Sequence, residues 1–443
     1  MTGRLGKANS LSFAAVGRLA LPNFQRLVAK FVERKDSSST LVQKVATAVV
    51  ESSKFFTLAS KKTSLGFVQQ VGLQNTDIET QWFFNLRLSY VLLASGDANG
   101  AAKVVDDFIE ANAETVATLK ALQRAAVQQP RDRSLQINSH RRLNAIYGRL
   151  LGALAMARLE NSEFEDAISV LNSWQPFPGP DVSVFETRVQ LKLLSFLGLV
   201  HTHMQEYDKA KLELLSALNA LDRDHTTPII YDVMSYFGDA CLELGQPQEA
   251  IEHIEPALQW TKATECLEDR HHRNLVVTYA EACILVRKYA EAERHLQALV
   301  CYFREKDLGV SDQRKYVRAL ILLAQIAHYQ ALRCFEWADA MQRWTQVTAG
   351  MSNFVVLDSK GWDFGVVCLS MSHVAFELAR KEEYTDWRLR AAKIFESEGH
   401  FWIRGFGTYW FDFIVRKRPE FGYLRPKTRL DRRSRAPLPS TCS

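Results

Sequence analysis

Residues 194–218 read LSFLGLVHTHMQEYDKAKLELLSAL, residues 234–258 read MSYFGDACLELGQPQEAIEHIEPAL, and residues 276–300 read VVTYAEACILVRKYAEAERHLQALV. The second stretch begins 40 residues after the first, and the third begins 42 residues after the second. At the same place in each stretch a large apolar residue precedes a small one: Gly198, Gly238 or Ala280. Such a period indicates a repeated supersecondary unit that buries its apolar face only by stacking on its neighbours.

This pattern resembles the tetratricopeptide repeat (TPR), which reads W-x2-L-G-x2-Y, then A-x3-F, then P. The Ala of the second helix has its counterparts at Ala210, Ala250 and Ala292. Leu, Met or Val stands where the family has Trp, and the closing Pro is absent. The resemblance implies helix–turn–helix hairpins whose two helices approach closely at the small residues, and it is clearest over 191–300.

Weaker copies flank this core. One upstream copy consists of Leu151, Leu154, Ala155, Phe164, Ala167 and Leu171, and an earlier one of Leu88, Ser89, Leu92, Ala101 and Val105. Downstream, Ala340, Trp344 and Val347 fit a second helix, although a frame that starts on Ala338 also fits. A last hairpin is expected over 364–395.

Proline placement favours helix almost throughout. No proline occurs in 23–129 or 257–418, and proline inside a helix costs about 3 kcal/mol. We therefore expect an all-α fold, a right-handed α–α superhelix (a solenoid) of TPR-like helical hairpins with a C-terminal capping helix. The expected segments are a basic N-terminal segment (1–35), N-terminal helical or TPR-like repeats (36–175), a TPR-like array (185–400), an aromatic capping helix (401–418) and a basic disordered tail (419–443).

Residues 111–145 fit no repeat. Ala113, Val116, Ala117, Leu119 and Leu122 predict one extra helix that ends near Pro130. Arg131, Arg133, Arg141 and Arg142 follow it and are interpreted as a solvated basic loop.

The net charge of +5 averages unlike regions. Residues 1–32 contain five basic and no acidic residues, and residues 416–435 have a net charge of +7, which leaves −7 for 33–415. An acidic body is a poor nucleic-acid surface, because neutralising phosphates requires a basic one. The basic tail (Arg416, Lys417, Arg418, Arg425, Lys427) could still contact an acidic partner or a nucleic acid.

The N-terminus and the cysteines bear on location. Phe24, Leu27, Val28 and Phe31 form an apolar face at helical spacing in an acid-poor segment, as expected of a packed helix, a leader or a membrane-surface helix. The seven cysteines include no C-x-x-C pair, which indicates a reducing compartment. No apolar run reaches the roughly 18 residues of a membrane span. We expect an intracellular protein, cytoplasmic, with the mitochondrion as the alternative.

Motifs of catalysis are missing from the sequence. It contains no Gly-x-Ser-x-Gly, no phosphate-binding loop and no His-Glu-x-x-His. Cys241 and Cys283 stand at a packing position of the repeat and are interpreted as small apolar residues. We therefore expect no enzyme activity, no cofactor and no metal site.

Binding surface is the remaining source of function. Stacked hairpins form a groove lined by the first helix of each hairpin. The residues predicted to be exposed there, and to bind a peptide or helix of a partner, are Lys192, Ser195, Asp232, Ser235, Tyr236, Asp239 and Asn274.

Aromatic residues crowd the C-terminal segment. Phe406, Tyr409, Trp410 and Phe413 share one helical face, with Arg404, Arg416, Lys417 and Arg418 nearby. This pattern is typical of a helix that caps the array, and partner docking or base stacking are its alternatives. Taken together, the sequence predicts a non-catalytic scaffold or adaptor for protein–protein interaction, a subunit of a larger assembly. The alternative is a helical-repeat RNA-binding factor, inside an organelle or outside one, that uses its basic ends.

Overall fold

The structure is a computed structural model. It describes residues 65–66, 78–128, 134–178, 184–220, 229–262, 270–304, 308, 310–352, 362–397 and 408–424. The expected N-terminal segment (1–35), Arg131, Arg133, Arg425 and Lys427 lie outside these residues. None of the described helices is long and apolar enough to cross a membrane.

The described residues form α-helices and one 3-10 helix, and no strand. The helices are α4 (Ile78–Ala94), α5 (Ala98–Ala111), α6 (Ala113–Gln128), α7 (Ser134–Glu160), α8 (Phe164–Asn172), α9 (Val184–His203), α10 (Tyr207–Ala220), α11 (Ile229–Glu243), α12 (Pro247–Lys262), α13 (Arg270–Leu285), α14 (Tyr289–Arg304), α15 (Val310–Cys334), α16 (Trp337–Ser352), α17 (Trp362–Glu377), α18 (Lys381–Ser397), α19 (Thr408–Lys417) and the 3-10 helix η2 (Pro419–Leu424). The expected all-α fold is confirmed.

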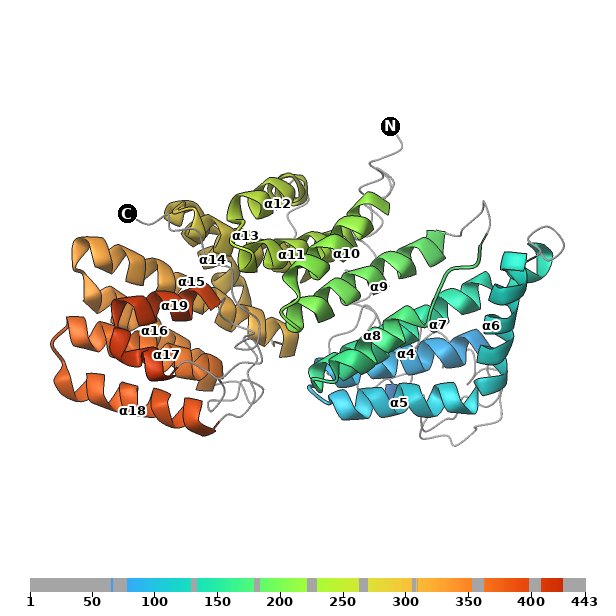
Figure 1. Cartoon of the computed structure of the whole chain (residues 1–443), viewed down its shortest axis with the longest axis horizontal. Helices are drawn as coiled ribbons and strands as arrows, with labels where there is room; N and C mark the ends of the chain where they lie inside the picture. The colour runs from blue at the N-terminus through green and yellow to red at the C-terminus, as the bar shows by residue number, and fades with distance from the viewer. Residues whose placement is uncertain are drawn as a thin grey trace, which may run out of the picture. The chain divides into compact units, whose positions relative to one another are not determined.

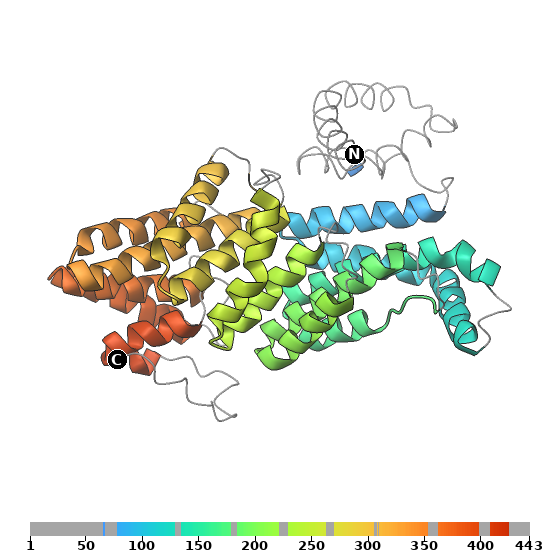
Figure 2. The ribbon, with the colours of Figure 1, turned by 90° about the horizontal axis from the view of Figure 1, so that it is seen from above.

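The chain divides into two compact units, unit 1 (1–196) and unit 2 (197–443), with the boundary inside α9. In unit 1, α4 packs on α5, and α7 packs on α4, α5 and α8. In unit 2, successive helices from α10 to α18 pack on one another, and α13 also contacts α11 and α15 directly. Antiparallel helical hairpins are visible within each unit (Figures 1 and 2). We call the first helix of each hairpin A and the second B, so that α4, α7, α9, α11, α13, α15 and α17 are A helices.

The turns between A and B helices share one geometry. In six of them an N–H bonds to the carbonyl five residues earlier: Asp97 to Leu92, Glu163 to Arg158, Glu206 to His201, Gln246 to Cys241, Lys288 to Cys283 and Arg380 to Ala375. The residue before each of these N–H groups has a positive φ: Gly96, Ser162, Gln205, Gly245, Arg287 and Ala379. This is the Schellman C-cap, which satisfies carbonyls at a helix end. The repeat is therefore built into the backbone as well as the core.

Small residues bring the paired helices together. A Cβ added to Gly238 would lie 2.6 Å from Ile254 of α12 and 2.8 Å from Thr278 of α13. A Cβ on Gly198 would collide in the same way with the side chain of Leu214. The partner alanines Ala210, Ala250 and Ala292 are fully buried. The predicted repeat frame over 191–300 is confirmed.

Burial decides between the two repeat frames that the sequence allows downstream, one on Ala340 and the other on Ala338. Ala340, Trp344 and Val347 are fully buried on α16, whereas Ala338 is exposed. The frame on Ala340 is therefore the one that the chain uses. Helices α17 and α18 form the expected last hairpin.

The region between the first two hairpins departs from expectation in one respect. The extra helix is confirmed as α6, but Arg141 and Arg142 do not lie in a solvated loop. Both belong to α7, where Arg141 is buried and forms an ion pair with Glu186 of α9 at 2.7 Å. Glu186 also accepts a hydrogen bond from the Phe177 N–H at 3.0 Å, so it ties the Pro-rich segment to the hairpins.

Candidate functional site

Five of the seven predicted groove residues lie on two adjacent A helices of unit 2. Asp232, Ser235, Tyr236 and Asp239 belong to α11, and Asn274 belongs to α13. The other two, Lys192 and Ser195, lie on α9 in unit 1.

The exposure expected for these residues is wrong for three of them, since Ser195, Asp232 and Ser235 are only 1%, 5% and 3% exposed. Ser235 and Asp232 bond instead to the next A helix, to Thr278 at 3.1 Å and to Asn274 at 3.3 Å. The polar groups of Ser235 and Asp232 are therefore used in the packing of one A helix on the next. Lys192, Tyr236, Asp239 and Asn274 remain partly exposed.

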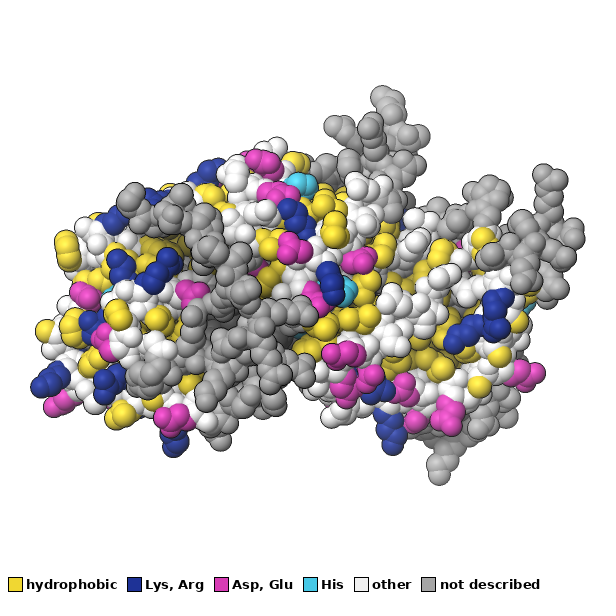
Figure 3. Space-filling model, viewed as in Figure 1, with side chains coloured by type: hydrophobic (Ala, Val, Ile, Leu, Met, Phe, Trp, Pro, Cys, Tyr) yellow, Lys and Arg dark blue, Asp and Glu magenta, His cyan; other side chains and the backbone are white. Residues whose placement is uncertain are grey.

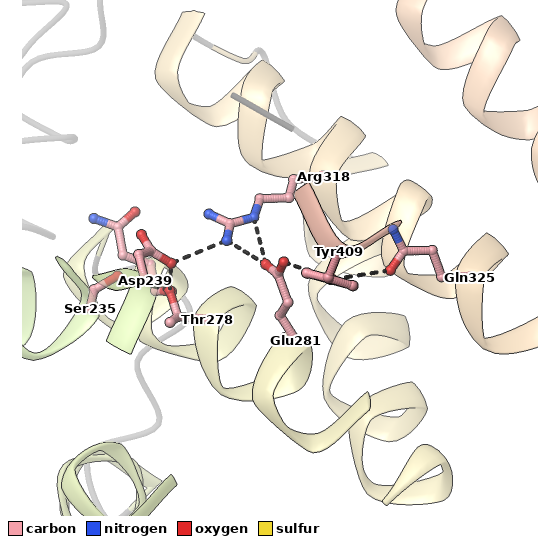
Figure 4. A network of polar contacts seen from close by, with 8 residues as sticks. Ser235, Asp239, Thr278, Glu281, Arg318, Gln325 and Tyr409 are labelled. Atoms are coloured by element: carbon pink, nitrogen blue, oxygen red, sulfur yellow. Dashed lines mark hydrogen bonds and ion pairs between the residues drawn. The ribbon is translucent and has the colours of Figure 1, made fainter. Parts of the chain in front are cut away.

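A polar network joins the A helices of unit 2 (Figure 4). The guanidinium of Arg318 on α15 donates to Asp239 on α11 at 3.1 Å and to Glu281 on α13. The hydroxyl of Thr278 also donates to Asp239, at 3.0 Å. We call Asp239, Thr278, Glu281, Arg318 and Tyr409 the unit 2 polar network. Within it, the charge of Arg318 is paired with the carboxylates of Asp239 and Glu281.

Tyr409 connects the network to the C-terminal helix. Its hydroxyl donates to Glu281 at 2.8 Å, across 128 residues of chain. Burial, reinforced by Glu281, raises the pKa of Tyr409 well above its ordinary value, so the phenol keeps the proton that it donates. Burial also raises the pKa of Asp239, against the opposing effect of Arg318.

Helix α19 therefore packs along the A helices of unit 2. Beside Tyr409, the fully buried Trp410 donates its indole N–H to Ser370 of α17 at 3.0 Å. Its ring centroid lies 5.2 Å from those of His328 and Tyr329 of α15. The predicted capping helix is present, and it reaches from the last hairpin back to α13. An amphipathic helix thus occupies an A-helix surface of this protein.

Two buried histidines lie beneath α19. Trp344 donates to Nδ1 of His328 at 3.2 Å, so the proton of this imidazole is on Nε2, which lies 2.9 Å from Nδ1 of His373. Burial lowers the pKa of both side chains, that of His373 to about 4, with Arg418 and Lys417 adding to the effect. Neutral imidazoles therefore hold this part of the core together.

The disordered basic tail expected over 419–443 is wrong for residues 419–424, and residues 425–443 lie outside the described residues. Residues 419–424 form η2, and Phe421 is fully buried. Arg418 is not a free cation of a tail, because it pairs with Glu420 at 3.0 Å and lies 3.3 Å above the ring of Phe376. Arg416 and Lys417 are exposed.

The A helices of unit 1 present a different surface. The ammonium of Lys192 on α9 lies over two rings, 5.7 Å from the centroid of Tyr90 and 5.3 Å from that of Phe196. Two further cations, Arg87 on α4 and Arg149 on α7, were missed by sequence reasoning. The signal that could have found Arg87 is the spacing of Phe83, Arg87 and Tyr90, which places all three on one side of α4.

The reactive side chains do not form a catalytic arrangement within the described ranges. Cys241 and Cys283 are fully buried, and burial raises the pKa of their thiols to about 12 and about 11. A thiol with such a pKa is a poor nucleophile at neutral pH. No group of three or more His, Cys, Asp or Glu side chains suited to a metal ion occurs among the residues that the structure describes.

Known proteins resemble this chain in fold and not in sequence. No family model matches the sequence, and no curated protein sequence matches it. Among solved structures, a signal-transduction ATPase (STAND) protein with a tetratricopeptide-repeat sensor from Pyrococcus horikoshii aligns with a TM-score of 0.50 at 13% identity, over 85% of this chain and 50% of that one. The apo form of the quorum sensor NprR from B. thuringiensis aligns with a TM-score of 0.49 at 11% identity, over 88% of this chain and 99% of that one.

The likeness to the STAND protein is one of fold. Together with the shared turns and the small residues at the helix crossings, it shows that the architecture of this chain is that of TPR-like helical repeats.

Proposed function

We propose that this protein is a non-catalytic scaffold or adaptor for protein–protein interaction, a subunit of a larger assembly. The observation that carries the proposal is the position of α19. The A helices of unit 2 receive an amphipathic helix through a tyrosine hydroxyl, a buried indole and a shared arginine network. A surface of this kind suits the helix-in-groove mode of recognition, in which apolar anchors insert and polar groups fix the register.

The side chains support binding over catalysis. The buried thiols are protonated, the two buried histidines are neutral and lie beneath α19, and Arg318 pairs with Asp239 and Glu281. The described free cysteines, with Cys301 and Cys334 exposed, suit a reducing compartment, and we propose an intracellular site of action.

Charge on one face of the molecule is mixed, which also favours protein partners. On the face that Figure 3 shows, basic and acidic side chains are interspersed among hydrophobic ones. Nucleic-acid binding by the repeats would require a continuous basic surface.

Affinity purification tests this proposal. Tagged full-length protein is isolated from native extract with and without nuclease, and bound proteins are quantified by mass spectrometry against the bait. Proteins that remain at a stoichiometric ratio after nuclease treatment are expected. Recovery of partners only from untreated extract would overturn the proposal in favour of the RNA-binding alternative, and recovery of none at stoichiometric ratio would remove its basis.

A further inference from the structure

Three cations on neighbouring A helices of unit 1 have no acidic partner. They are Arg87 on α4, Arg149 on α7 and Lys192 on α9, and we call them the unit 1 cation cluster. Each is partly exposed, and none forms an ion pair within the part of the chain that the structure describes. The Nε–H of Arg87 is buried without a hydrogen-bond acceptor. The cluster therefore presents positive charge that the fold leaves unneutralised.

Other partly buried cations of unit 1 are paired. Arg141 bonds to Glu186 at 2.7 Å, and Arg158 bonds to Asp106 at 2.6 Å and to Glu163 at 2.8 Å. Arg142, although more exposed, still reaches Glu79 at 2.8 Å. Because unit 1 supplies carboxylates for these arginines, their absence around the cluster is a local property of its A-helix surface.

The cluster also contains repulsion. Burial lowers the pKa of Arg87, and the neighbouring charge of Arg149 lowers it further. Like charges held near each other in a partly desolvated place destabilise the fold. Natural proteins accept such costs mainly where a ligand relieves them.

Aromatic rings lie against two of these cations, Arg149 and Lys192. Lys192 lies over Tyr90 and Phe196, and the guanidinium of Arg149 lies 5.9 Å from the ring centroid of Phe83. Helix α4 packs on α7, and α7 meets α9 closely, since a Cβ on Gly152 would lie 3.1 Å from Leu193. The three cations therefore lie on one surface, which is formed by the adjacent helices α4, α7 and α9.

The same contacts indicate which anion fits. Base stacking needs open ring faces, but here a cation already lies over each of the three rings. Carboxylates need only the free N–H groups of Arg and Lys, which form strong charge-assisted hydrogen bonds with them. An acidic protein segment therefore complements the cluster without displacing any of these cation–ring contacts, whereas base stacking on the same ring faces would have to displace them.

We propose that the unit 1 cation cluster binds the carboxylates of an acidic segment of a protein partner. This inference rests on the proposed function in one respect, that the partner is a protein. It adds the site, its residues and the chemistry of the segment that it binds.

Binding of two matched peptides to the full-length protein tests the proposal. One labelled peptide of about 16 residues, long enough to form a helix, combines Glu with Ala and Leu, and its counterpart replaces every Glu by Gln. Fluorescence anisotropy measures both, together with a labelled single-stranded RNA. We expect the Glu peptide to bind at least about tenfold more tightly than the Gln peptide, and its affinity to fall as salt screens the charges.

Variants locate the site. Arg149→Gln and Lys192→Gln should each weaken binding of the Glu peptide by about tenfold, as expected for losing one charge-assisted hydrogen bond. Lys103→Gln is the matched control, because Lys103 is exposed on α5, a B helix of the same unit. It should leave affinity unchanged, and melting temperatures check that all three variants fold.

Several results would overturn the proposal. They are equal affinity for the Glu and Gln peptides, no binding of the Glu peptide at about 1 mM, an equal loss in Lys103→Gln, or RNA binding tighter than the Glu peptide through the same residues. If nuclease-resistant partners are recovered while the peptides fail, the scaffold function stands and this site is wrong. If the peptides bind as expected but only nucleic-acid-dependent partners are recovered, the reverse holds.

Discussion

The A helices of the two units carry charge in opposite ways. In unit 2, Arg318 is shared between Asp239 and Glu281, and α19 packs on the same helices through Tyr409 and Trp410. In unit 1, Arg87, Arg149 and Lys192 have no acidic partner among the described residues, and Arg149 and Lys192 lie over aromatic rings. In unit 2 the charge of Arg318 is neutralised by other described residues of the chain, whereas in unit 1 none of the described residues neutralises the three cations.

This difference shows that the repeat determines where a surface forms and the individual side chains determine what it binds. Both units share the same hairpin and the same turn, as the bonds from Glu163 to Arg158 and from Lys288 to Cys283 show. The charges differ because they occupy A-helix positions that the packing of the repeat leaves unspecified. Four substitutions or conditions can break or sharpen the comparison.

Among the substitutions, removing the indole of Trp410 should have the largest effect. Trp410→Ala deletes a fully buried side chain and its hydrogen bond to Ser370, which should cost about 3–5 kcal/mol. Hydrogen exchange in α13, α15 and α17 measures the loss, and unit 1 should be unaffected. Trp387→Ala on α18 is the control, because Trp387 is only partly buried and should cost far less. Equal costs would mean that α19 does not stabilise unit 2.

Removing the charge of Arg318 should have the second largest effect. Arg318→Gln leaves Asp239 and Glu281 without their cation and should cost about 2–3 kcal/mol, less than a fully buried pair because a quarter of the side chain is exposed. Adding Asp239→Asn and Glu281→Gln should recover much of this cost, as denaturant unfolding can show. Arg343→Gln is the control: its exposure is similar, but its acids lie 3.7 and 3.8 Å away. A loss as large in the control would refute a special role for the network.

Acid should weaken unit 2 through its buried histidines. Both have folded pKa values below the roughly 6.5 of an unfolded histidine, that of His373 at about 4. Between these values the unfolded chain binds more protons, so the stability that is complete above pH 6.5 falls as pH drops toward about 4. The slope should be about 1.4 kcal/mol per pH unit for each histidine.

Hydrogen exchange of α15 and α17 across this pH range measures the slope. His373→Gln removes one titrating group and should make the slope shallower. An unchanged slope in this variant would show that the histidines are not the groups responsible.

Relieving the repulsion in unit 1 should have the smallest effect, and of opposite sign. Arg149→Gln removes the charge that opposes Arg87 and should stabilise unit 1 by about 0.5 kcal/mol. Chemical denaturation followed by exchange in α4 and α7 can detect it, with Lys103→Gln as the neutral reference. A loss of stability would mean that Arg149 is paired in solution and that the cluster is not a binding surface.

The sequence predicted the fold well because packing at the helix crossings needs particular residues. At positions 198 and 238 only glycine fits, because any side chain would collide with Leu214 or Ile254. The repeat could therefore be recognised in the sequence. The turns were less visible, because Ser162, Gln205, Arg287 and Ala379 take positive φ without being glycine. Their geometry is imposed by the hairpins on either side.

The candidate surfaces could be predicted only in part. Lys192 and Asp239 were found from the repeat frame. The frame does not show which polar residues form hydrogen bonds between neighbouring A helices, as Ser235 does with Thr278. Arg87 and Arg149 became significant only once α4 and α7 lay side by side. The contact of Tyr409 with Glu281 spans 128 residues, and no local pattern encodes it.

Chemical protection of Lys192 tests the central claim most directly. The rate at which a small reagent acetylates Lys192 is measured in the full-length protein alone and in its purified, nuclease-treated complex, with Lys103 as the internal reference. A partner that uses the unit 1 cation cluster should slow acetylation of Lys192 by about tenfold or more, the change expected for a tightly occupied charge-assisted contact, and leave Lys103 unchanged. Equal rates at Lys192 in the free protein and in the complex would contradict the account.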